Sequence, residues 1–549
     1  MSYPIGLSTL LRPLLAAAAS LLLAAGAAPA QLPLVGLSAV RGQAFDNEDL
    51  FFFVPEVGDH FGWALAAGDF NGDGAEDLAT GIPFDEGLVG SACGNCGIVV
   101  VRYGAPGSGL LGGLADTVLY QGLAGSPDPP EASDRFGAAL AAGDFNGDGF
   151  DDLAVGVPGD HAFSNGIAVG AVQVHYGTAG GLELGNPEYL DEGLAWTEVE
   201  PFICIGDEFG AALAVGNFDG DAFDDLAIGA PMACIGSNPF VDDAGEVFVA
   251  HGSSAGLLPL AGYGISENSA GIFGDAANGE RFGGALAAGD FDADGHDDLA
   301  IGVPHEGDNG SLYVIMGSPF GLIYVNSVFW APGALGLEPE EGDRLGFALA
   351  AADFDGDGHD DLAIGDPNED LGAANEIADA GSISIAYGSP AWFDLSRTDN
   401  FTQEILYSDP LANQSGDQFG WALAAGDFDG DGRADLVAGH PGEEVEGLVN
   451  AGATTILMGA PDAGLGARVG SLAAGVDGAP GSGQAHADFG RALASGDFDG
   501  NGFADLAVGA PYLNAGGIED TGGETVLYGS LFADGFEVGS PLRWSSAVP

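Results

Sequence analysis

The sequence predicts an all-β fold, a seven-bladed β-propeller of four-stranded antiparallel blades whose ring is closed by an N-terminal strand. Three observations carry this prediction. One acidic loop recurs seven times, its copies begin 63 to 75 residues apart, and short, glycine-punctuated apolar segments flank each copy. A four-stranded sheet cannot bury both of its faces alone, so seven similar sheets are expected to stack around one axis.

The first thirty residues have the pattern of a secretory signal peptide. Arg12 supplies a positive charge, residues 14–23 are apolar, and Ala28-Pro29-Ala30 offers a small-x-small cleavage site. The apolar stretch is short for a membrane span. We therefore expect a signal peptide in residues 1–30 and a mature chain outside the cytoplasm, with no insertion in a membrane.

The segment 34–45 precedes the first repeat and has no blade of its own, whereas the seventh copy lacks an obvious fourth strand. We expect this segment to become the outer strand of the last blade, because an open ring would leave two unpartnered blade faces and a bare strand edge. The propeller is then expected to span residues 31–530.

One repeat is illustrated by the second copy. Residues 135–143 lead into the acidic loop, residues 152–158 leave it, and residues 170–177 alternate between apolar and polar side chains. A weaker fourth strand is expected at residues 182–190. After the seventh repeat, residues 531–549 resemble a short tail seen on some secreted bacterial proteins, and an ordinary C-terminus is an equally open interpretation.

The acidic loops carry oxygen-bearing side chains at positions 1, 3, 5 and 9, and a backbone carbonyl at position 7 can add a further ligand. This is the donor set that Ca²⁺ prefers, and a glycine at position 6 permits the sharp turn. The expected ligands, copy by copy, are Asp69, Asn71, Asp73, Ala75 and Asp77; Asp144, Asn146, Asp148, Phe150 and Asp152; Asn217, Asp219, Asp221, Phe223 and Asp225; Asp290, Asp292, Asp294, His296 and Asp298; Asp353, Asp355, Asp357, His359 and Asp361; Asp427, Asp429, Asp431, Arg433 and Asp435; Asp497, Asp499, Asn501, Phe503 and Asp505.

Up to seven calcium ions are therefore expected, one per blade. An EF-hand is excluded because position 12 is not a glutamate and no helices flank the loop. Turn capping alone would explain Asp and Asn in such loops, but it does not require an aspartate at position 9 seven times. The third copy should bind calcium most weakly, because it has Asn217 at position 1 and Ala222 in place of the glycine.

Composition narrows the classes of partner. The formal net charge is −71 and the 11 basic residues are all arginine, so the chain should repel nucleic acid and anionic membranes. The four cysteines of an exported protein favour disulfides, for which three pairings are possible. We favour Cys93 with Cys96 and Cys204 with Cys234, because each pair lies within one repeat.

The repeats resemble the FG-GAP repeats of the integrin α-subunit N-terminal propeller. The matching residues are the Phe-Gly pairs that start at residues 61, 136, 209, 282, 419 and 489, with Leu345-Gly346 departing in the fifth copy, and the Gly-x-Pro ends that start at residues 81, 156, 229, 302, 365, 439 and 509. The resemblance implies calcium loops on the lower face and partner recognition on the opposite face. There the variable connections 84–97, 159–169, 232–244, 368–380 and 442–451 would gather.

No catalytic residue is expected. Residues 252–256 match the pattern of a hydrolase nucleophile elbow around Ser254, but they occupy the turn after the third strand of a blade. Residues 394–398 faintly resemble an adhesion metal motif without its α/β context. We expect a secreted or cell-surface protein of bacterial origin that acts as a non-enzymatic binding or adhesion module for an unknown extracellular protein or glycan. The alternatives are an extracellular polysaccharide-active enzyme and a surface-structural protein.

Overall fold

A computed structural model describes residues 37–46, 55–86, 93–110, 116–123, 128–161, 168–191, 206–235, 241–258, 264–372, 377–407, 413–461, 464–466, 468–476 and 479–529. The expected signal peptide, the C-terminal tail 531–549 and Cys204 lie outside these residues. All structural statements below refer to the described part of the chain.

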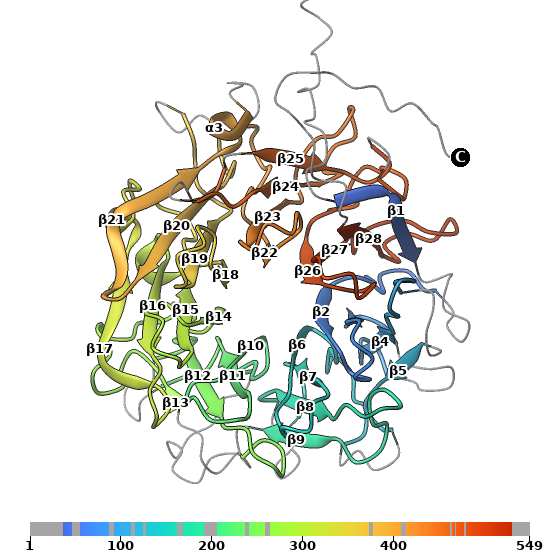
Figure 1. The fold of residues 1–549 in the computed structure, drawn as a ribbon, viewed down its shortest axis with the longest axis horizontal. Coiled ribbons are helices and arrows are strands. Elements are labelled where there is room, and N and C mark those ends of the chain that lie inside the picture. Colours follow the sequence, from blue (N-terminus) through green and yellow to red (C-terminus); the bar gives the residue numbers. More distant parts are fainter. Residues whose placement is uncertain are drawn as a thin grey trace, which may run out of the picture.

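The described chain forms seven four-stranded antiparallel sheets arranged around an axis, which confirms the predicted seven-bladed propeller (Figure 1). The first three blades are β2 (Ala64–Gly68), β3 (Asp77–Ile82), β4 (Ile98–Arg102) and β5 (Thr117–Leu119); β6 (Ala139–Gly143), β7 (Asp152–Val157), β8 (Ala171–His175) and β9 (Glu188–Asp191); and β10 (Ala212–Gly216), β11 (Asp225–Ala230), β12 (Glu246–Ala250) and β13 (Gly264–Ile265).

Blades four to six are β14 (Ala285–Gly289), β15 (Asp298–Val303), β16 (Ser311–Met316) and β17 (Ile323–Trp330); β18 (Ala348–Ala352), β19 (Asp361–Asp366), β20 (Ser382–Ser389) and β21 (Trp392–Phe401); and β22 (Leu423–Gly426), β23 (Asp435–His440), β24 (Ala453–Leu457) and β25 (Val469–Leu472). The short helices are η3 (Glu306–Asp308), η4 (Pro332–Ala334) and α3 (Gln403–Tyr407).

The seventh blade is completed by the N-terminal strand, as the sequence predicts. β1 (Leu37–Asp46) pairs antiparallel with β28 (Gly523–Gly529), which continues through β27 (Asp505–Gly509) to β26 (Ala492–Gly496). Figure 1 shows the blue first strand beside the red last blade. The two ends of the described chain therefore share one sheet, and no blade face at the seam is left open.

The Phe-Gly and Gly-x-Pro signatures hold neighbouring blades together. The phenylalanines of the six Phe-Gly pairs, and Leu345 in the fifth copy, are at most 1% exposed. A side chain at Gly81 would place its Cβ 2.1 Å from the carbonyl oxygen of Gly137 in the next blade. The same contact joins Gly509 to Gly62, at 2.2 Å, across the seam of the ring. Only glycine allows this backbone approach.

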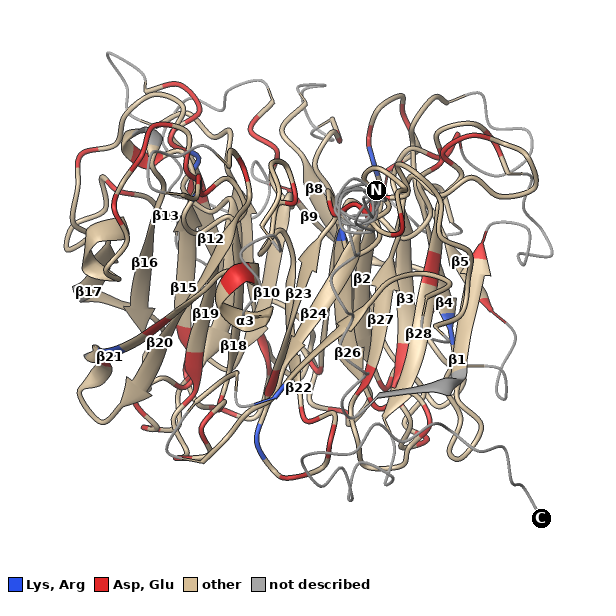
Figure 2. Ribbon diagram, turned by 90° about the horizontal axis from the view of Figure 1, so that it is seen from above, with Lys and Arg blue, Asp and Glu red and all other residues tan. Residues whose placement is uncertain are grey.

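Each blade runs between two ends of the propeller. The innermost strand, such as β2, begins after Phe-Gly at one end and reaches the acidic loop at the other, and the second strand returns to Gly-x-Pro. We call the end with the acidic loops the lower end and the end with Phe-Gly and Gly-x-Pro the upper end. Figure 2 shows the propeller from its side, with acidic residues at both ends of the blades.

The hydrophobic core lies between blades. One cluster combines Phe145 and Val172 of the second blade with Leu226 and Phe248 of the third, and equivalent clusters recur around the ring. The fourth strand of the second blade differs from expectation, since it begins at Glu188 rather than at residue 182. The reason is that Leu182 belongs to a turn, where its N–H donates to the Tyr103 hydroxyl of the preceding blade at 3.1 Å.

A buried ion pair marks the seam between the last and first blades. Arg102 on β4 pairs with Glu524 on β28, and Thr80 also donates a hydrogen bond to Glu524 at 2.6 Å. The guanidinium lies over the ring of Phe45, a β1 residue, at 4.2 Å from its centroid. One arginine thus connects the first blade, the last blade and the closing strand.

The predicted disulfide between Cys93 and Cys96 is present. Cys234 is disulfide-bonded as well, and its predicted partner Cys204 lies outside the described residues. In the described part of the chain, no helix has the length and apolar character needed to cross a membrane.

Candidate functional site

The seven acidic loops lie at the lower end, each between the innermost and second strands of its blade. In every copy except the third, the carboxylate at position 1 organises the loop. Its oxygens accept the N–H of position 5 at 2.9–3.1 Å and that of position 6 at 2.7–2.9 Å. The glycines at position 6 have φ between +86° and +91°, a conformation that suits glycine. The loop backbone therefore curves around the position-1 carboxylate, which holds it in place through these hydrogen bonds.

The aspartate at position 9 links the loop to the rest of its blade. All seven of these residues are at most 1% exposed. One oxygen accepts the N–H of position 2 at 2.9–3.1 Å, and the other accepts the N–H of a glycine at or just beyond the end of the third strand at 2.6–2.9 Å. Burial raises the pKa to about 8 for Asp77, Asp152, Asp298, Asp361, Asp435 and Asp505.

The fourth loop tests whether these residues fit a cation. Asp290, Asp292 and Asp294 each offer a carboxylate oxygen, and the three oxygens lie within 4.8 Å of one another. Asp292 Oδ1 is buried without a hydrogen-bond partner. Converging carboxylates with an unsatisfied oxygen suit a hard divalent cation. The donor set of this loop therefore fits calcium.

Arginines reach two of the other acid-rich loops. Arg397 pairs with Asp355, the position-3 residue of the fifth loop. In the sixth loop, Arg468 lies 3.1 Å from Asp429 and Arg433 pairs with Asp431. In these two loops, some of the four carboxylates are thus paired with arginine and are not all free to bind a metal.

The third loop is built differently. Asn217 donates through Nδ2 to the carbonyl of Asp221 at 3.1 Å, and Ala222 lacks the positive φ of the glycines it replaces. His251 Nδ1 lies 3.1 Å from Asp225 Oδ2 and 3.7 Å from Asp219 Oδ2. The hydrogen bond to Asp225 raises the pKa of His251. This histidine can supply the positive charge that a metal would supply elsewhere.

Position 8 was missed by the sequence analysis and connects neighbouring loops. In all seven copies its N–H donates to the position-1 carbonyl of the preceding copy, for example Asp151 to Asp69 at 3.1 Å and Glu76 to Asp497 at 2.9 Å. Asp151, Asp224, Asp297 and Asp360 also accept the position-1 N–H through their carboxylates at 2.8–3.1 Å. The paired acids at positions 8 and 9 were the available signal.

A second group of residues was also missed and lies at the upper end, near the axis. Four of its residues share one repeat position, two residues after the first residue of the Phe-Gly or Leu-Gly pair and at most two residues before an innermost strand: Trp63, Phe347, Trp421 and Arg491. The Arg491 guanidinium lies 5.1 Å from the Trp63 ring centroid and 4.7 Å from that of Trp421.

Further aromatic rings extend this group. Phe84 lies 4.9 Å from Trp63, Phe347 lies 4.7 Å from Trp421, and Tyr512 lies 5.5 Å from the Arg491 guanidinium. All six side chains are partly exposed. We call Trp63, Phe84, Phe347, Trp421, Arg491 and Tyr512 the aromatic patch.

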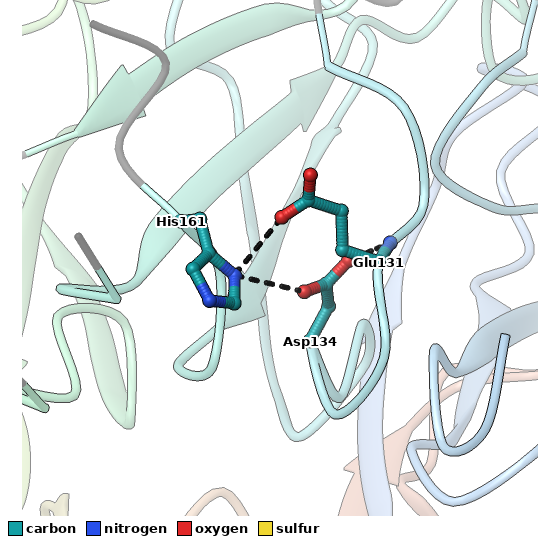
Figure 3. Close-up of side chains that lie close together, drawn as sticks. All are labelled: Glu131, Asp134 and His161. Atoms are coloured by element: carbon teal, nitrogen blue, oxygen red, sulfur yellow. Dashed lines mark hydrogen bonds and ion pairs between the residues drawn. The ribbon is translucent and has the colours of Figure 1, made fainter. Parts of the chain in front are cut away.

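The upper end of the second blade carries a mixed cluster of histidine and carboxylates. His161 Nδ1 lies 3.0 Å from Glu131 Oε2 and 3.9 Å from Asp134 Oδ1 (Figure 3). Asp134 is fully buried, and its other oxygen accepts the N–H of Glu131. Here a histidine of the chain itself stands beside a buried carboxylate.

Seven segments of the chain match the FG-GAP repeat family: residues 61–91, 136–175, 209–249, 282–315, 345–385, 419–457 and 489–526. Each segment contains one acidic loop and the strands on both sides of it. The match therefore follows the blades one by one.

Several proteins are similar to part of the chain. A phosphatidylinositol-glycan-specific phospholipase D of Mus musculus is 37% identical over 179 residues, which are 31% of this chain and 20% of that protein. Integrin alpha-PS2 of Drosophila melanogaster is 31% identical over 242 residues, 42% of this chain and 15% of the integrin. Integrin alpha-V of Gallus gallus is 30% identical over 237 residues, again 42% of this chain, and 20% of the integrin. The chain thus spans about a fifth or less of these relatives.

Proposed function

The chain belongs to the FG-GAP repeat family, and on that premise we propose that it is a secreted, calcium-binding, non-enzymatic module that recognises an extracellular protein or glycan. The propeller would occupy residues 31–530 of the mature chain, after removal of the signal peptide 1–30. Similarity to two integrin α-chains supports a binding role.

Calcium is proposed to bind at the lower end through the side chains at positions 1, 3, 5 and 9 and the carbonyl at position 7. Bound calcium would neutralise carboxylates that otherwise repel one another within each loop. Because position 8 ties every loop to the preceding one, the ions would also stabilise contacts between blades. The fourth loop, with its converging oxygens, is the best candidate, and the third loop remains the weakest.

The aromatic patch is the observation that carries the binding proposal. Partly exposed aromatic rings around an arginine are the composition of energetic hot spots in protein interfaces. Aromatic rings also stack on the faces of sugars, so a glycan partner fits the same surface. The patch draws residues from the first, fifth, sixth and seventh blades, so it exists only when the ring is closed.

The test is a protein and glycan array probed with the mature protein in calcium and in chelator. We expect a ligand that binds in calcium and is lost in chelator. Release of product from a polysaccharide would instead support the extracellular enzyme. Hydrolysis of a phosphatidylinositol-glycan would also support an enzyme, a possibility opened by the phospholipase D relatives. Self-assembly without a ligand would support a surface-structural protein.

Variants then locate the binding surface. Trp63→Ala and Trp421→Ala should each weaken binding of the array ligand at least tenfold, because each removes a partly exposed ring of the patch. Phe320→Ala is the matched control, since Phe320 is 92% exposed in a turn away from the patch. Equal losses in all three variants, or a loss only with Phe320→Ala, would place the binding surface elsewhere.

A further inference from the structure

A pair of acidic residues recurs at the upper end of five blades. The first member stands two residues before the Phe-Gly or Leu-Gly pair, and the second stands two residues after the proline of Gly-x-Pro. The pairs are Asp59 and Asp85, Asp134 and Asp160, Glu280 and Glu306, Asp343 and Glu369, and Asp417 and Glu443. Each first member accepts the backbone N–H of the residue three positions earlier, so its carboxylate caps a turn.

In the sixth blade, side chains of the chain itself contact the second member of the pair, Glu443. The middle residue of its Gly-x-Pro is His440, whose Nδ1 lies 3.2 Å from Glu443 Oε2 and whose Nε2 lies 3.1 Å from the Thr455 hydroxyl. Gln403 donates to Glu443 Oε2 at 2.6 Å. An imidazole and an amide therefore contact Glu443, much as the imidazole of His161 stands beside Asp134 in the second blade (Figure 3).

The fifth blade has an aspartate where the sixth has a histidine. Asp343, Asp366 and Glu369 are 3%, 1% and 9% exposed, and each offers an oxygen within 4.8 Å of those of the other two. Among the described residues, no arginine or histidine forms an ion pair with these three carboxylates, and the charge of Arg344 lowers the pKa of Asp366 by less than burial raises it. Burial raises the pKa of Asp343, Asp366 and Glu369, to about 6, 7 and 8.

Unsatisfied oxygens provide a separate observation at the same place. Asp366 Oδ1 accepts the N–H of Arg344 at 2.8 Å, whereas its Oδ2 is buried and has no hydrogen-bond partner. The neighbouring Asn368 Oδ1 and Glu340 Oε2 are also buried oxygens without a partner. Buried acceptors are nearly always hydrogen-bonded, so a group of buried oxygens without a donor in the protein is typical of a place that binds a water molecule or a cation. All of these atoms are hard oxygen donors, which favour Ca²⁺ over softer metals.

We propose that Asp343, Asp366 and Glu369 form a calcium site at the upper end of the fifth blade, distinct from the acidic loop at the lower end of that blade. The ion would contact the carboxylates of the fifth blade from the position that the His440 imidazole occupies in the sixth blade. The fourth blade differs, because the Tyr313 hydroxyl donates to Glu267 within its cluster of glutamates at 2.9 Å. The hydroxyl group of Tyr313 therefore gives the fourth blade a partner for its acids that the cluster of the fifth blade does not have.

Equilibrium dialysis of the mature protein against CaCl₂, with elemental analysis, tests the stoichiometry. Asp366→Asn should bind one calcium ion fewer per chain than the wild type. Glu341→Gln is the matched control, because Glu341 is exposed on the loop that carries Asp343 and its substitution removes the same charge. An unchanged count in Asp366→Asn, or an equal loss in Glu341→Gln, would overturn the proposal.

A second variant, Asp366→His, distinguishes loss of the site from misfolding. It places in the fifth blade the histidine that the sixth blade has at the same position, His440, so it is expected to fold. This variant should also bind one ion fewer, and in chelator it should melt at a higher temperature than the wild type. Crystals of the wild type grown with MnCl₂ should show an anomalous peak between Asp343, Asp366 and Glu369. A full ion count in Asp366→His, or anomalous peaks only at the lower loops, would contradict the site.

Discussion

At the scale of single residues, aspartates of one loop have separable roles. Asp298, at position 9, is 1% exposed and accepts two backbone N–H groups. Asp294, at position 5, has a side chain that is 49% exposed. The first is part of the blade whether or not a metal is bound, whereas the second is a proposed calcium ligand at the surface.

Asp298→Ala should therefore destabilise the protein by about 3 kcal/mol even in chelator, because two buried donors lose their acceptor. Asp294→Ala should cost less than about 1 kcal/mol in chelator but should reduce the stabilisation gained from calcium. Urea unfolding of both variants, with and without calcium, checks this. Equal effects of the two substitutions in chelator would argue against a separate structural role for position 9.

Asp417 gives a prediction about pH. Burial, and then the charge of Glu443, raises the pKa of Asp417 to about 8, above the 3.8 expected in the unfolded chain. The native state thus holds a proton that the unfolded state releases above about pH 4. The resulting stability is present below pH 4 and is lost as pH rises through 8.

In chelator, the urea midpoint should fall between pH 5 and pH 8, and Asp417→Asn should reduce that fall. Glu404→Gln, an exposed change on α3, should leave the fall unaltered. A pH dependence that is the same in the wild type and Asp417→Asn would show that other groups govern it.

At the scale of elements, most of the strands were predictable from sequence. The seven acidic loops mark the turn between the first two strands of every blade, so their spacing located those strands, and the unpaired segment 34–45 predicted β1. The fourth strands were less predictable. Leu182 is apolar and suits a strand, yet it belongs to a turn that binds Tyr103 of the preceding blade, a contact made only when blades stack.

The candidate sites were also predictable only where their residues lie close together in sequence. The calcium ligands could be proposed because they lie within one short loop and recur in seven copies. His251 and Asp366 contact residues that lie far apart in sequence, so no local pattern reveals them. The acids at position 8 do recur beside those at position 9, but their contacts with the preceding loop exist only once blades stack. The aromatic patch had a signal, since Trp63, Phe347, Trp421 and Arg491 share one repeat position. That these residues form one patch could not be predicted from the repeat alone, because only the closed ring brings this position of several blades together near the axis.

β1 is the element whose removal should be most informative. A mature chain that begins after Asp46 should expose the edge of β28, to which β1 is paired. We expect a lower melting temperature and association of chains, measured by light scattering. A chain that begins at Leu37 serves as the control and should remain as stable as the full mature chain. A monomeric, equally stable truncation would mean that β1 is dispensable for closure.

At the scale of the whole molecule, the seam depends on the ion pair between Arg102 and Glu524, whose side chains are 3% and 0% exposed. Removing one partner leaves the other charge buried and unpaired, so Arg102→Met should destabilise the protein by about 3 kcal/mol or more. Combining it with Glu524→Met should recover part of that loss. Chemical denaturation of the single and double variants tests this. A double variant that loses as much unfolding free energy as the two single variants together, or more, would refute it.

Calcium should act on the whole ring. If free calcium is about tenfold above each dissociation constant, every loop gains roughly 1.4 kcal/mol, and seven independent loops gain on the order of 10 kcal/mol. Chelation should therefore lower the melting temperature, and added calcium should restore it while magnesium restores less. An unchanged melting temperature after chelation would rule out a structural role for calcium.

The pairing of β1 with β28 also sets an order of events during synthesis. The first strand of the described chain to be made waits for the last one before it has a partner. A polypeptide cut short at its C-terminus would keep an unpaired N-terminal segment and an exposed blade face, both of which are targets for proteases and chaperones. Completed synthesis is thus visible in the structure itself, because only a chain translated through the seventh blade can pair β1 with β28.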